Sequence, residues 1–153
     1  MKSAEGNNHL SSEPLGTESI QLAQGNGGTL TKRLIDHVFK NKANKDLDLL
    51  HDAATVTFDG PYLSITTDSF VVSPPTFPGG NVGALSVYGT VNDLAVVGAT
   101  PRYISTAFII EEGFSLSTLK QIVNGMHQAA EETKVAIVTG DTKVVPTGSG
   151  GGV

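Results

Sequence analysis

The chain has 153 residues, of which 39% are hydrophobic and 16% are charged, and its formal net charge is −5 at pH 7. These values fit one compact globular domain, and the acidic balance without a basic cluster argues against nucleic acid as the main partner. The sequence contains no cysteine, which excludes a disulfide framework, a thiolate zinc site and a cysteine nucleophile within these residues.

The N-terminal part of the chain leads up to a glycine-rich loop. Residues 1–18 are polar and without periodicity, which predicts a flexible segment. Residues 19–24 alternate and predict a short edge strand. The glycine-rich residues 25–28 then precede an apolar helical stripe, which Thr29 or Thr31 is expected to cap. A helix N-terminus behind such a loop suits phosphate, although this loop matches neither the Walker A nor the dinucleotide-binding pattern.

A hairpin and a capped helix are predicted in the middle of the chain. Residues 54–68 alternate with period two on both sides of Asp59-Gly60, which indicates a β-hairpin. After a stretch rich in proline and glycine, Asn81 is expected to cap a helix that runs to about Val97. Gly98 then ends this helix.

Two buried strands separated by a helix complete the predicted fold. Residues 102–112 and 134–141 are rich in β-branched residues, and a helix between them begins at Ser115 or Ser117. The ββαβαβ order predicts an α+β fold, with a mixed four-stranded sheet and helices on one face. The other face would be apolar and bare, so we expect the sheets of two copies to pair across a homodimer.

The predicted domain occupies most of the chain. It spans residues 19–146 and is followed by a Gly-rich tail, residues 147–153, which is expected to stop before a second domain. No apolar run approaches the roughly 20 residues of a membrane helix, and the N-terminus lacks the apolar segment of a secretory signal. We therefore expect a cytoplasmic protein without a membrane partner.

Four aspartates share similar predicted surroundings. They lie before the hairpin, at the end of its second strand, on the first long helix and after the last strand: Asp52, Asp68, Asp93 and Asp141. Carboxylates brought together repel one another unless a cation separates them, and oxygen ligands suit Mg²⁺ that also bridges to phosphates. The spacing leaves two interpretations open, which are a shared metal site and aspartates that form turns or cap helices.

Several blocks of the sequence, taken together and in collinear order, resemble a known family. They are GNGGTL, HDAA, TTDSFVVSPPTFPGGNVGALSVYGTVNDLAVVGATP, FIIEEGF and VTGDTKVV. They are similar to the N-terminal domain of the HypE family of hydrogenase maturation proteins, within the superfamily of aminoimidazole ribonucleotide synthetase and selenophosphate synthetase. The resemblance runs from about residue 19 to the end of the chain.

The resemblance implies a reaction, cofactors and partners. ATP and Mg²⁺ would bind in a cleft between two such domains, whose sheets join into a barrel across the homodimer. A carbamoyl group on the thiol of a C-terminal cysteine would be dehydrated to a thiocyanate, the source of cyanide for nickel-iron hydrogenases. The implied partners are a carbamoyltransferase and the hydrogenase scaffold proteins. The alternative is a dimerisation and docking module without catalysis of its own.

The same resemblance implies roles for individual residues. The four aspartates would gather around the metal and the triphosphate. The residues expected near the nucleotide are Gly25, Asn26, Gly27, Gly28, Asn92 and Thr142. Lys143 would steady the transferred phosphate, or else be a solvated loop lysine.

Two departures from the family pattern limit these expectations. These residues contain no cysteine and are expected to stop before the C-terminal domain that carries the acceptor thiol, so they are not expected to complete the reaction alone. Asn26 stands where Ser is expected, and His51 where relatives often have Asp, which bears on the phosphate contacts of the loop and on the metal count.

Overall fold

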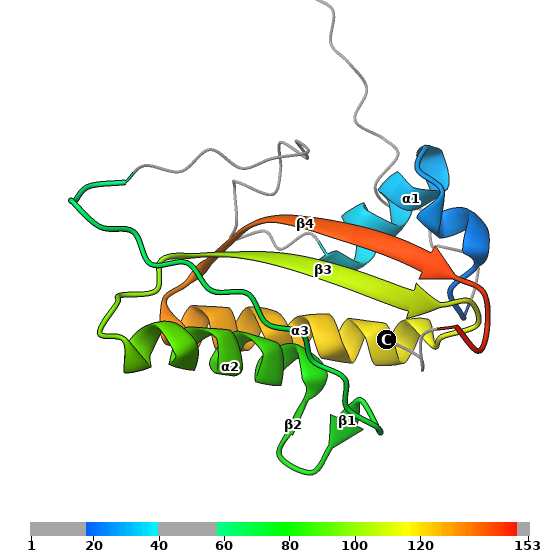
Figure 1. Ribbon diagram of the computed structural model, residues 1–153. Coiled ribbons are helices and arrows are strands. Elements are labelled where there is room, and N and C mark those ends of the chain that lie inside the picture. Colours follow the sequence, from blue (N-terminus) through cyan, green and yellow to red (C-terminus); the bar gives the residue numbers. More distant parts are fainter. Residues whose placement is uncertain (1–17, 40–57, 150–153) are drawn as a thin grey trace, which may run out of the picture.

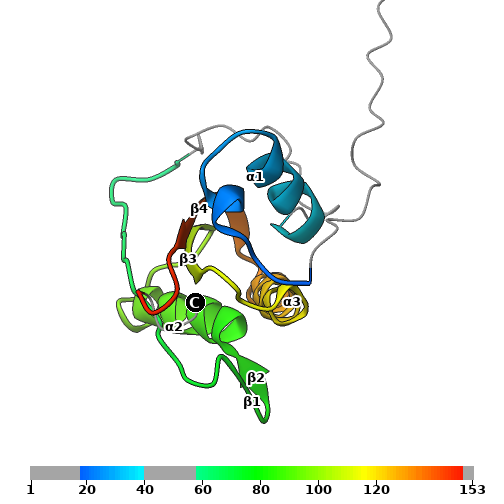
Figure 2. The same ribbon diagram turned by 90° about the vertical axis from the view of Figure 1, so that its right-hand side faces the viewer.

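The computed structural model describes residues 18–39 and 58–149 of the chain (Figure 1). In chain order, its helices and strands are the 3₁₀ helix η1 (Leu22–Gly25), α1 (Thr29–Leu34), the π-helical turn η2 (Ile35–Phe39), β1 (Thr76–Phe77), β2 (Gly80–Asn81), α2 (Val82–Val96), β3 (Tyr103–Glu111), α3 (Leu116–Thr133) and β4 (Ala136–Val145). Helices α2 and α3 lie side by side beneath β3 and β4, while α1 lies near β4 and α3 (Figures 1 and 2). No helix of the described part is long and apolar enough to cross a membrane.

The two long helices begin at side-chain caps that the sequence predicts. Asn81 Oδ1 accepts a hydrogen bond from the Ala84 amide at 3.0 Å, and α2 then runs to Val96. Ser115 Oγ accepts from the Thr118 amide at 3.4 Å at the start of α3. Each cap satisfies one of the amide donors left free in a first helical turn. The predicted extent of α2 and the Ser115 start of α3 are thus confirmed.

Strands β3 and β4 are parallel and are joined through α3, so the three elements form a βαβ unit. Along β3, Ile104, Phe108 and Ile110 point to the helices and pack in or against the core. The intervening residues, such as Ala107 and Ile109, are exposed on the opposite side, which we call the open face of the sheet. Helices on one face agree with the prediction, and no described helix or strand covers the second face.

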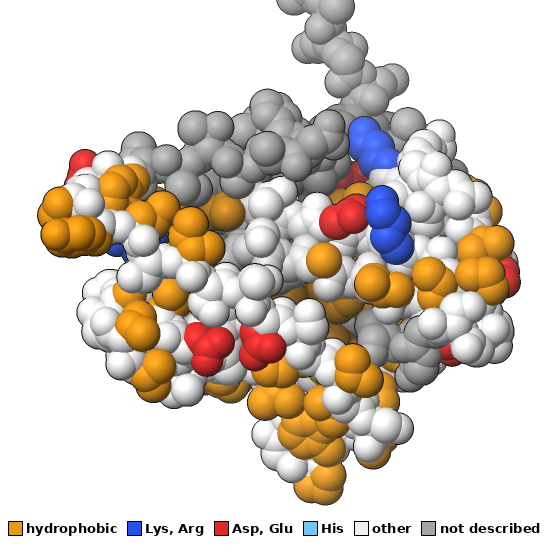
Figure 3. Space-filling model, viewed as in Figure 1, with side chains coloured by type: hydrophobic (Ala, Val, Ile, Leu, Met, Phe, Trp, Pro, Cys, Tyr) orange, Lys and Arg blue, Asp and Glu red, His pale blue; other side chains and the backbone are white. Residues whose placement is uncertain are grey.

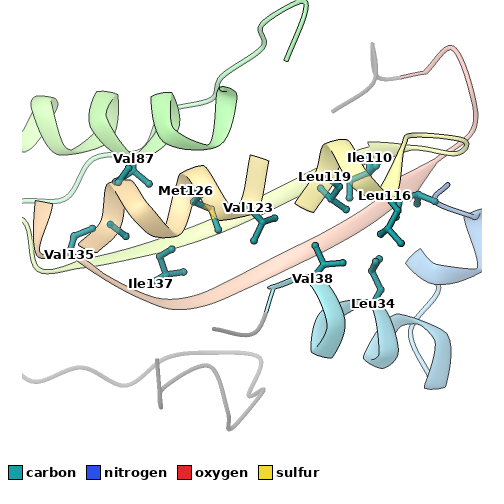
Figure 4. Packing of buried hydrophobic residues seen from close by; sticks show 13 residues of the cluster. Leu34, Val38, Val87, Ile110, Leu116, Leu119, Val123, Met126, Val135 and Ile137 are labelled. Atoms are coloured by element: carbon teal, nitrogen blue, oxygen red, sulfur yellow. The ribbon is translucent and has the colours of Figure 1, made fainter. Parts of the chain in front are cut away.

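The core lies between α3, the sheet and the N-terminal helical elements (Figure 4). Helix α3 contributes the longest apolar stripe, with Leu119, Val123 and Met126 buried. Leu34 of α1 and Val38 of η2 pack against this cluster from the other side. Burying one aliphatic side chain of this size stabilises a fold by about 1.5–3 kcal/mol, so α3 anchors the layer.

The predicted four-stranded sheet is not found among the described residues. They form two separate two-stranded sheets, the parallel β3–β4 pair and a short antiparallel pair of β1 with β2. Residues 58–68 of the predicted hairpin lie in no strand, and residues 54–57 lie outside the described part. Leu63 and Ile65 are 63% and 83% exposed, because no strand within residues 18–39 and 58–149 covers them.

Three smaller predictions need correction. Of residues 19–24, expected as an edge strand, Ser19 forms an isolated antiparallel bridge with Ser115. Leu22–Gly25 form η1 instead, because the Gln24 side chain accepts from the Gln21 amide at 2.8 Å and closes a local turn. Gly28 precedes α1 with a φ of 82°, and no threonine side chain caps this helix. Strand β4 does not end at residue 141, because its pairing with β3 continues as far as Val145.

Candidate functional site

The glycine-rich loop packs directly onto the C-terminal part of β4. A side chain at Gly25 would place its Cβ 2.5 Å from the Val144 nitrogen, so only glycine allows this approach. Gly27 and Gly28 follow with φ values of 79° and 82°, which glycine adopts without strain. The loop is therefore held against β4 at one end and leads into α1 at the other.

Glu112, which the sequence analysis does not single out, also holds the loop. Its Oε1 accepts from the Leu22 amide at the start of η1, at 3.3 Å. Its backbone carbonyl accepts from Thr147 Oγ1 at 3.1 Å, in the residues after β4. The residue after β3 is thus joined both to η1, which leads into the glycine-rich loop, and to the segment beyond β4.

Asp141 and Lys143 lie on the open face of the sheet. They pair in register with Ala107 and Ile109 of β3, and cross-strand partners share a face. Lys143 Nζ lies 3.4 Å from Asp141 Oδ1, and both side chains are more than 60% exposed. An ion pair this exposed contributes at most about 1 kcal/mol. The prediction that Asp141 follows the last strand is wrong, because this residue lies inside β4.

Thr142 occupies the other side of β4. It pairs with Phe108, which packs against the core, and so points toward the helices. Val144, which contacts the glycine-rich loop, belongs to the same side of the strand. The sheet therefore separates the candidate residues into a pair on the open face and a glycine loop beside the covered face.

Asp93 lies on α2, the helix on which the sequence places it, and both Asp93 and Asn92 are exposed. Asp93 Oδ2 accepts a hydrogen bond from Thr66 Oγ1 at 3.3 Å. One turn earlier on the helix, a Cβ at Gly89 would lie 2.6 Å from Phe70 Cζ, so the Phe70 ring rests on the glycine. The segment that contains Asp68 is thereby held along this part of α2.

Asp68 lies between these two contacts. Its Oδ1 accepts from the Ser69 amide at 2.7 Å, and its side chain is exposed. Figure 3 shows two acidic side chains next to each other over α2, and an acidic and a basic side chain together over β3 and β4. Within residues 18–39 and 58–149, no group of three or more His, Asp or Glu side chains is close enough to hold a metal ion. Asp52 and His51 lie outside the described residues.

Lys120 and His37 form a polar contact away from the candidate site. Lys120 Nζ of α3 lies 2.9 Å from His37 Nε2 of η2. Burial and the neighbouring ammonium group lower the pKa of His37 from its usual value of 6.5. The contact therefore favours a neutral imidazole that accepts from Lys120.

Comparison with known proteins identifies the class of this chain. The family model for the AIR synthase related protein, N-terminal domain, matches residues 50–153. The chain therefore belongs to the AIR synthase related family, and the part matched is the N-terminal domain of that family.

Within the family, the chain is similar to HypE, as the sequence blocks predict. Carbamoyl dehydratase HypE from Escherichia coli (strain K12) is 44% identical over 137 residues, which cover 86% of this chain and 41% of the relative. The crystal structure of hydrogenase maturation protein HypE in complex with ATP matches with a TM-score of 0.79 at 48% identity, over 84% of this chain and 38% of that chain. A chain of the HypE–HypF complex matches with a TM-score of 0.53 at 57% identity, over 54% of this chain and 27% of that chain. The chain thus spans about two fifths of the curated relative's length.

Proposed function

We propose that this chain is the Mg-ATP-binding domain of a HypE-like enzyme, which dehydrates a cysteine S-carboxamide to a thiocyanate. The observation that carries this proposal is the similarity, at 48% identity and a TM-score of 0.79, to a HypE structure in complex with ATP. At this identity, a shared ligand class is a sound basis for experiment. The resulting thiocyanate would supply cyanide for a nickel-iron hydrogenase.

The arrangement of carboxylates fits a magnesium–triphosphate ligand. Mg²⁺ is commonly held by one or two carboxylates together with substrate phosphates, and its remaining ligands are water. Asp68 and Asp93 are two oxygen donors held along the same part of α2 by the contacts of Thr66 and Phe70. Asp52 and Asp141 belong to the proposed metal set as well.

The remaining residues are proposed to hold the nucleotide. Backbone amides of the glycine-rich loop, from Gly25 to Gly28, would face the phosphates at the start of α1. Asn92 and Thr142 would donate hydrogen bonds to phosphate oxygens. Lys143 would move from its exposed contact with Asp141 to the phosphate being transferred, which costs little because that contact is weak.

The proposed chemistry is activation of an amide oxygen. The carbamoyl oxygen attacks the γ-phosphorus of ATP and ADP leaves, after which the C–O bond breaks and phosphate departs. The nitrogen loses its two protons, so that S–C(=O)NH₂ becomes S–C≡N. The protein's part is positioning and charge neutralisation. The chain contains no cysteine, so the acceptor thiol must come from residues outside this sequence.

Calorimetric titration of the chain with ATP, with and without Mg²⁺, tests the proposal. We expect binding that depends on Mg²⁺ and that is weakened at least tenfold by Asp68→Asn or Asp93→Asn, since each removes a charged metal ligand. Asp59→Asn is a matched control, because Asp59 is also an exposed aspartate of the same segment but is not proposed as a ligand. If neither substitution changes the affinity for ATP in the presence of Mg²⁺, the assigned site is refuted.

We also propose that the chain is a homodimer. Ile65 and Val71 are 83% and 81% exposed on a segment that no strand among the described residues covers, and a patch of this kind usually lies in an interface. Light scattering should report a dimer that Ile65→Asp dissociates. Leu30→Asp, at a partly exposed leucine of α1, should leave it intact.

The similarity to a chain of the HypE–HypF complex supports an additional docking role toward maturation partners. We propose a carbamoyltransferase and a hydrogenase scaffold protein as these partners. A stable dimer that binds no ATP would favour a pure dimerisation and docking module over the enzyme domain.

A further inference from the structure

We propose that Thr66 is a positioning residue, which holds the segment of Asp68 so that its carboxylate faces Asp93. This inference rests on the proposed function, because it assigns the two carboxylates to one magnesium ion. Nothing in the sequence blocks that carry the family resemblance singles out this threonine from its neighbour Thr67.

The first step concerns the two contacts that hold the segment. Thr66 Oγ1 donates to Asp93 Oδ2 at 3.3 Å, and the Phe70 ring rests on Gly89. Residues 89 and 93 are four positions apart, so they lie on the same face of α2, one turn apart. The segment is therefore fixed on both sides of Asp68 to a single helical face.

The second step concerns the direction of the Asp68 side chain. In an extended segment, successive side chains point to opposite sides, so residues 66, 68 and 70 share a side. Burial of the flanking residues follows this alternation, since Thr66, Phe70 and Val72 are half-buried while residues 65, 67, 69 and 71 are exposed, and Asp68 lies on the side of the first group with its side chain open to solvent. Asp68 therefore points to the side on which Thr66 and Phe70 meet α2.

The third step concerns the oxygens that remain for a cation. The Thr66 hydroxyl donates a hydrogen bond to Asp93 Oδ2, and the Ser69 amide donates one to Asp68 Oδ1. Among the hydrogen bonds within the described segments, the second oxygen of each carboxylate is not engaged. The Thr66 hydroxyl thus orients Asp93 while it leaves one oxygen for the metal, in the manner of groups that orient metal ligands elsewhere.

Thr66→Val and Thr66→Ser, compared with Thr67→Val, test the inference. Valine keeps the shape of threonine without the hydroxyl, serine keeps the hydroxyl, and Thr67 lies on the exposed side of the same segment. We expect Thr66→Val to raise the Mg²⁺ concentration needed for half-maximal ATP binding about two- to tenfold, the range for losing one ordinary, solvent-accessible hydrogen bond. Thr66→Ser and Thr67→Val should change it less than twofold.

A second measurement separates the placement of the segment from nucleotide binding. Because the chain has no cysteine, spin labels at Ser69→Cys and Glu131→Cys report the position of the segment relative to α3 without other reactive sites. The distance distribution should broaden in Thr66→Val and stay narrow in Thr67→Val. If the unsubstituted chain binds no ATP, the proposed function fails. The distance between the spin labels then still shows whether Thr66 holds the segment of Asp68 in place. If Thr66→Val matches Thr67→Val in both measurements, the role of Thr66 is overturned.

Discussion

Gly25 lies directly against Val144, so close that a Cβ on the glycine would be 2.5 Å from the valine nitrogen. The contact joins the start of the glycine-rich loop to the last residues of strand β4, more than a hundred residues later in the sequence. The position of the loop is therefore determined by the sheet, and any side chain at residue 25 must push the two elements apart.

A Gly25→Ala substitution should destabilise the domain by about 1–3 kcal/mol, the usual cost of an inserted group that packing cannot accommodate. It should also weaken ATP binding, because the amides of the loop are displaced. Denaturant unfolding measures the first effect and calorimetry the second. Asn26→Ala, at an exposed neighbour, should change stability by less than about 0.5 kcal/mol. Equal unfolding midpoints for the two variants would contradict the close contact.

Asn81 should matter more than an ordinary helix cap. Its Oδ1 caps α2 through the Ala84 amide, and its Nδ2 donates to the Gln121 carbonyl of α3 at 3.2 Å. We expect Asn81→Ala to cost about 1–2 kcal/mol, and Asn81→Asp to retain the cap while losing the donor. The free energy of unfolding should therefore be lower for Asn81→Ala than for Asn81→Asp, as measured by denaturant unfolding. Equal free energies of unfolding for the two variants would contradict a role for the cap, because both variants lose the contact to α3.

The pKa of His37 should respond to Lys120. Burial and the Lys120 ammonium lower it from 6.5, so the neutral ring is favoured in the folded chain. The stability that His37 contributes is therefore complete above pH 6.5 and is lost as the pH falls through the lower folded-state pKa. Lys120→Met should raise the His37 pKa only in part, because burial is the larger cause. An NMR titration of the imidazole measures it, with Lys134→Met as the control.

Tyr88 should titrate above its ordinary pKa of 10, because its hydroxyl donates to Glu132 and deprotonation would break this bond. Slight desolvation and the carboxylate charge act in the same direction. The stabilisation is thus present below pH 10 and lost as the pH rises through the folded-state pKa. Glu132→Gln should bring the pKa of Tyr88 down toward 10 in a tyrosine NMR titration. Glu131→Gln should not change it.

Local signals in the sequence were sufficient for the elements that depend on local chemistry. Asn81 and Ser115 predicted the starts of the two long helices because a cap needs only its own first turn. The β-branched residues of 102–112 predicted the strand β3, although its exposed side was not expected of a buried strand. The family resemblance, carried by whole motif blocks, predicted the matched domain.

The predictions that failed depended on distant partners. The alternation of Leu63 and Ile65 indicated a strand, but a strand exists only where another strand pairs with it, and the described part of this chain provides none there. Asp141 was expected in a loop because Gly-Asp often forms turns, yet pairing with β3 carries β4 through both residues. Thr66 and Glu112 were missed because their partners lie 27 and 90 residues away.

The most direct test of the account is the position of the metal. Crystals of the chain grown with ATP and Mn²⁺, which replaces Mg²⁺ and scatters anomalously, locate the ion without reference to activity. The account predicts an anomalous peak within ligand distance of both the Asp68 and the Asp93 carboxylates and of the triphosphate. ATP bound with the ion beyond reach of both carboxylates would contradict it.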